Sequence, residues 1–140
     1  MPLTAEAVFL DLQRVAGALS QALATVLKPH GLSPTQYNVL RILRGSPAGL
    51  TCSQISTRMI THDPDVTRLA DRLVDRGLAS RDRHASDRRV IVIQPTEAGL
   101  ALLAALDPVI AGFHTATLGQ LAPKDLEALA ALLAQVRAAT

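Results

Sequence analysis

Basic side chains gather in the middle of this chain of 140 residues, where they could bind a polyanion. Residues 41–90 hold ten of the fourteen Lys and Arg side chains, all of them arginine, together with six aspartates. Fixed cations that displace condensed counterions hold proteins to phosphates, so this charge pattern favours a nucleic-acid partner. The alternative is a solvated face on which Asp and Arg side chains pair with one another.

The first basic stretch has the pattern of an amphipathic helix over residues 64–76. Asp63 followed by Pro64 is typical of an N-cap and a first helical position, and Gly77 supplies a stop. Apolar residues recur at steps of three or four and predict a buried face formed by Val66, Leu69, Ala70 and Leu73. The outward face then carries Asp65, Thr67, Arg68, Asp71, Arg72, Asp75 and Arg76.

The second basic stretch predicts a β-hairpin over residues 79–94. Two short segments, the second rich in β-branched residues, flank a polar tip that begins at His84 and ends at Arg89. Asp87 lies two residues before Arg89, close enough to orient that guanidinium. The alternative is an exposed charged turn. The basic side chains of the hairpin are Arg81, Arg83, His84, Arg88 and Arg89.

Helices are expected on both sides of these stretches. Ser33, Pro34 and Gln36 form the signature of a capping box for a helix that runs to about Arg44, and Thr51 with Gln54 repeats it for a short helix. These elements predict a mainly α protein with a small β-hairpin, in one domain over 1–140. A winged helix-turn-helix lobe over 33–95 is enclosed by helices at 4–30 and 97–139.

This architecture assigns separate tasks to the two basic stretches. The first turn of a recognition helix enters the major groove, where Arg pairs with guanine and Thr contacts a thymine methyl or a phosphate. Thr67 and Arg68 are therefore the first candidates to contact double-stranded DNA, followed by Asp65 and Arg72. Arginines on a projecting hairpin suit the narrow minor groove. The candidates there are Arg81, Arg83, Asp87, Arg88 and Arg89.

Four segments in matching order resemble the MarR family of bacterial transcription regulators. They are SPTQY at 33–37, DPDVTRLADRLVDRGL at 63–78, SDRRV at 86–90 and PTEAG at 95–99. The resemblance implies a homodimer whose terminal helices interleave and place two winged lobes on successive major grooves of a pseudo-palindromic site. On the family pattern, Thr67 and Arg68 face the groove, while Asp87 and Arg89 form the pair at the wing tip.

The front of the expected recognition helix departs from many relatives, because it carries acid at Asp63 and Asp65. Two carboxylates facing DNA would repel phosphate unless they cap the helix or accept a hydrogen bond from cytosine. Asp63 is most simply the cap, which leaves the role of Asp65 open between these possibilities.

The resemblance also implies regulation, because relatives commonly release DNA when a small, often phenolic, anion binds or when a cysteine is oxidised. We therefore expect a repressor that responds to a small aromatic or anionic effector, with His30, Tyr37 and His62 as candidates to line its crevice. One alternative is a redox-responsive regulator that uses Cys52, because the positive end of a helix lowers a thiol pKa. Another is a winged-helix module that binds protein.

Other classes of function lack their signatures. The single cysteine excludes an internal disulfide framework, and the chain shows neither a leader pattern nor an apolar run of about 18 residues, so we expect a cytoplasmic protein without membrane contact. No catalytic motif is present and the four histidines lack metal-ligand spacing, so we expect no enzyme, metal or cofactor. The apolar terminal helices favour a homodimer, with packing inside a monomer as the alternative.

Overall fold

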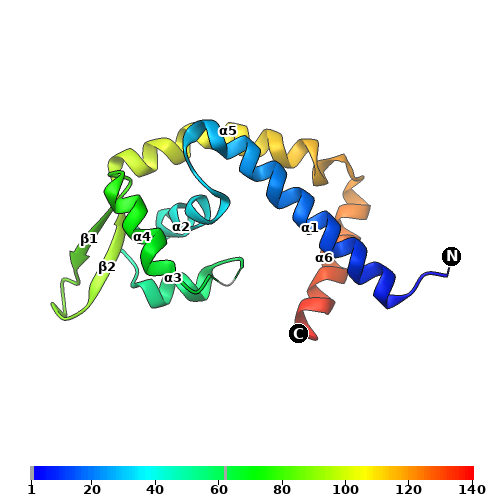
Figure 1. Ribbon diagram of the computed structural model, residues 1–140, viewed down its shortest axis with the longest axis horizontal. Coiled ribbons are helices and arrows are strands. Elements are labelled where there is room, and N and C mark those ends of the chain that lie inside the picture. The colour runs from blue at the N-terminus through cyan, green and yellow to red at the C-terminus, as the bar shows by residue number, and fades with distance from the viewer. Residues whose placement is uncertain (1, 62) are drawn as a thin grey trace.

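A computed structural model describes residues 2–61 and 63–140 of the chain (Figure 1). The described part is mainly helical with one antiparallel hairpin, as predicted. In chain order the elements are α1 (Ala5–Leu27), η1 (Lys28–His30), α2 (Pro34–Arg44), α3 (Cys52–Arg58), α4 (Val66–Asp75), β1 (Ala79–Arg83), β2 (Ile91–Pro95), α5 (Glu97–Ala116), η2 (Leu118–Gln120) and α6 (Pro123–Ala138).

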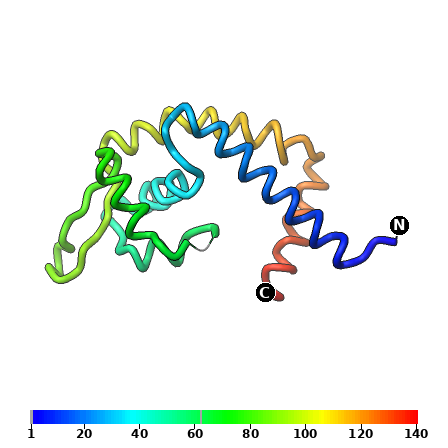
Figure 2. Tube along the Cα trace, in the orientation of Figure 1, coloured from blue at the N-terminus to red at the C-terminus, as the bar shows by residue number. Residues whose placement is uncertain are grey.

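The elements divide into a lobe and a helical arm (Figure 1). Helices α2, α3 and α4 gather at one end with the hairpin, which projects beyond them as a wing. Helices α1 and α5 lead away from this lobe to α6, and both chain ends lie at the far end of the arm (Figure 2). The lobe is therefore held on the arm by two long helices.

Local hydrogen bonds explain where most helices begin. Ser33 Oγ accepts from the Gln36 N–H at 3.2 Å, and Gln36 Oε1 accepts from the Ser33 N–H at 3.0 Å. Thr51 and Gln54 make the same reciprocal pair at 3.1 and 2.9 Å. Both predicted capping boxes are confirmed, and each satisfies two backbone donors that the helix itself leaves unpaired.

The predicted start of the recognition helix at Pro64, with Asp63 as its cap, is wrong. Helix α4 begins at Val66, and its N-cap is Asp65, whose Oδ1 accepts from the Arg68 N–H at 3.1 Å. Asp63 Oδ1 instead accepts from the Asp65 N–H at 2.8 Å and holds the turn before the helix. Two carboxylates flank one proline here, so the sequence offered two N-caps with nearly the same local signal.

The base of the wing contains an isolated β-bridge that the sequence did not predict. Strands β1 and β2 pair antiparallel from Ala79 opposite Pro95 to Arg83 opposite Ile91. Leu50, just before α3, forms a bridge with Ile93 through two backbone hydrogen bonds of 2.7 and 3.0 Å. A bridge of a single residue has no alternation of apolar and polar residues, so the sequence contains no pattern that predicts it. The bridge ties the base of the wing to the start of α3.

An aliphatic core joins the lobe to the arm. Its fully buried members include Leu27 from α1 and Leu103 and Leu106 from α5, which meet Leu40 and Leu73 of the lobe in one cluster. By length and composition alone, α5 could also cross a membrane. Its buried residues Leu103, Leu106 and Ile110 are part of this core.

Candidate functional site

Helix α4 turns a polar face outward at the edge of the lobe. Val66, Leu69, Ala70 and Leu73 are buried and hold the helix in place. Thr67, Arg68 and Arg72 are exposed. Within 2–61 and 63–140, no ion pair joins Arg68 or Arg72 to the aspartates of their own helix. Among the described residues, Arg68 and Arg72 are therefore not neutralised by aspartates of α4, which was the alternative interpretation of this face.

The acids at the front of α4 are occupied by backbone donors. As described above, Asp65 caps the helix and Asp63 holds the preceding turn. Both carboxylates thus act on the backbone that presents Thr67 and Arg68. Asp65 therefore caps the helix, which is one of the roles that the sequence left open for it.

Two of the clustered arginines brace the lobe internally. Arg81 on β1 forms an ion pair with Asp71 on α4 and so links the wing to the helix. Arg76, at the C-terminal end of α4, donates to the backbone carbonyls of Gly31 and His30. Gly31 has a φ of 71°, the left-handed conformation that ends the helix before it. Arg76 thereby connects the end of α4 to η1, the turn that follows α1.

The wing tip is organised around Asp87. Its Oδ1 accepts from the Arg89 backbone N–H at 3.0 Å and from the Arg89 Nε at 3.3 Å. These two hydrogen bonds, the backbone bond first, lower the pKa of Asp87, and the charge of His84 adds to the effect. Arg83 Nη1 donates to the Arg88 carbonyl at 2.7 Å and closes the loop. The Arg89 side chain remains 92% exposed, so it is held at one end and presented to solvent.

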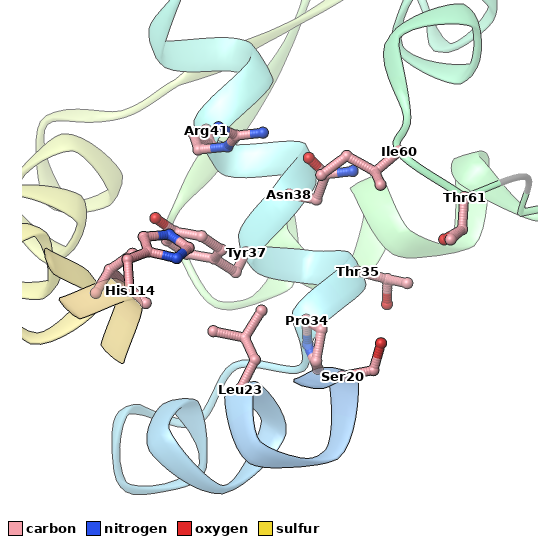
Figure 3. Close-up of a pocket in the computed structure, with 11 residues that line it drawn as sticks. Ser20, Leu23, Pro34, Thr35, Tyr37, Asn38, Arg41, Ile60, Thr61 and His114 are labelled. Atoms are coloured by element: carbon pink, nitrogen blue, oxygen red, sulfur yellow. The ribbon is translucent and has the colours of Figure 1, made fainter. Parts of the chain in front are cut away.

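A pocket of about 280 Å³ lies between the lobe and the arm (Figure 3). Its walls come from α1, α2, α5 and the connection at Ile60 and Thr61 that precedes α4. The lining residues are Ser20, Leu23, Pro34, Thr35, Tyr37, Asn38, Arg41, Ile60, Thr61, Ile110 and His114.

Of the three residues predicted to line an effector crevice, one lines this pocket. Tyr37 lines this pocket, whereas His30 is not among its lining residues and instead offers its carbonyl to Arg76. His62 lies outside the described residues. Arg41 was not predicted, although it lies one helical turn beyond Tyr37 on the same face. His114 was not predicted either, because it comes from α5 and no local pattern links it to the pocket.

The arm carries a second, apolar hollow of about 620 Å³ between α1 and α6. Helix α6 has no buried residue, and Leu132 and Val136 on it are 58% and 53% exposed. On α1, Leu27 alone is buried, while Phe9 is 57% exposed. Both helices therefore leave apolar faces uncovered within the single chain.

Other chemistry is sparse in the described part of the chain. No group of three or more His, Cys, Asp or Glu side chains lies close enough to hold a metal ion among these residues. Cys52 is half-buried at the first position of α3 and packs against the core.

Comparison with known proteins agrees with this fold. The model of the MarR family matches residues 32–91. A MarR transcription factor from Planctomyces limnophilus is 36% identical, with a TM-score of 0.73 over 96% of this chain and 98% of its own. CouR from Rhodococcus jostii RHA1, solved with p-coumaroyl-CoA bound, is 25% identical, with a TM-score of 0.81 over 92% of this chain and 90% of its own. MepR of S. aureus, solved in complex with DNA, is 21% identical, with a TM-score of 0.84 over 99% of this chain and 100% of its own.

Proposed function

This chain belongs to the MarR family of transcription regulators, and from that premise we propose that it is a cytoplasmic repressor that binds a pseudo-palindromic operator as a homodimer. The observation that carries the proposal is the outward face of α4, where Thr67 and Arg68 are exposed directly after a cap made by Asp65. No catalytic role is part of this proposal, since the family consists of DNA-binding regulators.

Helix α4 is proposed as the recognition helix, with its first turn in the major groove. Arg68 there can pair bidentately with guanine, and Thr67 can contact a thymine methyl or a phosphate. Arg72 lies one turn later, where it can contact either a base or a phosphate. Asp65 is proposed to aid DNA binding by capping this helix, because its carboxylate accepts a hydrogen bond from the Arg68 N–H.

The wing is proposed to enter the minor groove through Arg89 and Arg88. Asp87 restrains the Arg89 guanidinium at its Nε edge, which leaves the outer nitrogens for bases or phosphates. A narrow minor groove concentrates negative potential and attracts such a group. Arg81 and Arg83 support this element from inside, through Asp71 and the Arg88 carbonyl.

The homodimer is proposed to form through the arm, with residues 4–30 and 97–139 as its helices and residues 33–95 as the DNA-binding lobe. A helix of sixteen residues with no buried side chain gains little from its own chain. Isolated helices near that length are marginal in water, so α6 needs a partner surface. The apolar hollow beside α1 supports a second copy of this chain as that partner.

Release from DNA is proposed to follow when a small anionic effector binds the pocket between lobe and arm. Arg41 supplies a cation, and Ile60 and Thr61 in the pocket wall precede the turn that caps α4. A ligand that moves these two residues would therefore move the recognition helix. The relative CouR, solved with p-coumaroyl-CoA bound, supports regulation by a bound ligand.

Two substitutions test the DNA-binding proposal. The operator is first selected from random duplex DNA, and binding is then followed by fluorescence anisotropy over a range of KCl concentrations. Arg68→Ala and Arg89→Ala should each weaken binding about 10- to 100-fold, the range of a lost base contact. Lys124→Ala, an exposed cation on α6, should bind as the parent does.

Sedimentation of each variant checks that the dimer persists. If Arg68→Ala and Arg89→Ala bind the operator as tightly as the parent, α4 and the wing do not form the DNA interface.

A further inference from the structure

An ion pair ties the lobe to α5 at a point that the proposed DNA contacts do not use. Arg44, the last residue of α2, donates through its Nη1 to both carboxylate oxygens of Asp107 on α5, at 2.9 and 3.1 Å. The two residues are 63 positions apart in the chain. Among the described residues, these are the side-chain hydrogen bonds that reach α5 from the helices of the lobe. The pair therefore spans the junction between lobe and arm.

Asp107 lies at a weak point of α5. Pro108 follows it inside the helix. Proline has no N–H, so the Ala104 carbonyl receives no hydrogen bond from it, and a helix bends most easily at such a site. Helix α5 begins beside the hairpin of the lobe and continues into the arm (Figure 1). A change of bend at Pro108 would therefore swing the lobe relative to the arm.

Apolar packing alone does not fix the angle between lobe and arm. Leu40 of α2 lies in one cluster with Leu103 and Leu106 of α5, and apolar contacts are non-directional. A charge-assisted hydrogen bond is directional, because donor, hydrogen and acceptor must align. The side chains of Arg44 and Asp107 are 36% and 50% exposed, so the pair adds little to overall stability. Its contribution is instead a preference for one angle over its neighbours.

We propose that Arg44 and Asp107 are positioning residues that set the spacing of the operator half-sites. The pair holds each lobe at one angle to the arm, and in a homodimer joined through its arms the two angles fix the distance between the two α4 helices. One base pair added between the half-sites moves the far one by about 3.4 Å and turns it by about 35°. A held lobe follows this change only at a cost, so one spacing binds best. The inference rests on the proposed binding of DNA by a homodimer.

The test compares operators that differ only in spacing. The selected operator, and versions with one base pair added or removed at its centre, are titrated with the full-length protein, and binding is followed by anisotropy. An exposed ion pair favours one geometry by a factor of about two to five, and a homodimer holds two such pairs. Arg44→Met and Asp107→Ala should each reduce the preference for the selected spacing by about 4- to 25-fold. Lys124→Ala should leave that preference unchanged.

Two comparisons distinguish positioning from a direct contact with DNA. If Arg44 bound a phosphate itself, Arg44→Met would weaken binding equally at every spacing, and Asp107→Ala would strengthen it. The reversed pair, Arg44→Glu combined with Asp107→Arg, should regain the preference for spacing because it restores an ion pair across the same junction. A lowered melting temperature with an unchanged preference in either single variant, or no recovery in the reversed pair, overturns the proposal.

A measurement without DNA separates this inference from the proposed function. Ser53, exposed on α3, is changed to cysteine in a Cys52→Ser background and carries a nitroxide label. Pulsed electron–electron double resonance then gives the distribution of distances between the two lobes of the dimer. Arg44→Met should broaden this distribution, and equal widths in parent and variant overturn the proposal.

The two proposals fail in different ways. A parent protein that binds no duplex refutes the proposed function, together with the inference that rests on it. A parent that binds its operator as a dimer, while Arg44→Met and Asp107→Ala keep its preference for spacing, refutes the positioning role alone.

Discussion

Asp65 is expected to influence DNA binding through the helix that it caps. Its Oδ1 accepts from the Arg68 N–H at 3.1 Å, in the turn that presents Thr67 and Arg68. Asparagine caps helices as well as aspartate does, whereas alanine offers no acceptor. Asp65→Asn should therefore keep the helix start while removing a negative charge from the surface proposed to face phosphates. Asp65→Ala should lose the cap.

The size of each effect follows from the contact. Loss of an N-cap costs about 1 kcal/mol, which lowers the melting temperature by about 4 °C for a chain of this size. If the same cost falls on the DNA-bound state, Asp65→Ala binds the operator about fivefold more weakly. Asp65→Asn should bind up to a few-fold more tightly at low salt, and the gain should shrink as salt screens the lost repulsion.

The assay pairs thermal unfolding with operator binding at several KCl concentrations. Asp125→Asn serves as the control, since Asp125 is an exposed acid in the first turn of α6, away from the lobe. The reasoning is refuted if Asp65→Asn melts like the parent but binds more weakly. It is equally refuted if that variant selects a different base pair in the operator. Either result would make Asp65 a base contact.

Two further predictions concern the frame of the wing. Gly99→Ala should lower the free energy of unfolding in urea by about 1–3 kcal/mol, because the added Cβ would lie 2.1 Å from the Leu78 carbonyl oxygen. The control is Gly112→Ala, whose Cβ would meet nothing within 4 Å and should cost far less. Equal stabilities of the two variants would contradict the close packing of α5 against Leu78. The pKa of Asp87 is lowered in the folded protein, so its contribution to wing stability is present above the unfolded pKa of about 4 and is lost as pH falls through the folded value. A carboxyl titration by NMR should show that Arg89→Ala raises this pKa towards its ordinary range, and an unchanged titration would show that the wing-tip hydrogen bonds are absent.

Most helix starts could be predicted because their signals are local. Ser33 with Gln36 and Thr51 with Gln54 are three residues apart, and their side chains bond the backbone of the same turn. The start of α4 was misplaced by two residues, because Asp63 and Asp65 match the N-cap pattern almost equally. In the structure Asp65 is the N-cap, and Val66 is buried at the first position of the helix.

The sequence by itself determined that the middle of the chain is basic, that it contains an amphipathic helix and a hairpin, and that helices flank it. Periodicity, capping and charge depend on residues that are neighbours in the chain, so they can be recognised in the sequence alone. Only the tertiary structure showed that some of these arginines, such as Arg76 and Arg81, bond to groups on other elements of the fold. It also brought Asn38 and Arg41 beside residues of α1 and α5. Such contacts join positions far apart in the chain, and nothing in the local sequence specifies their partners.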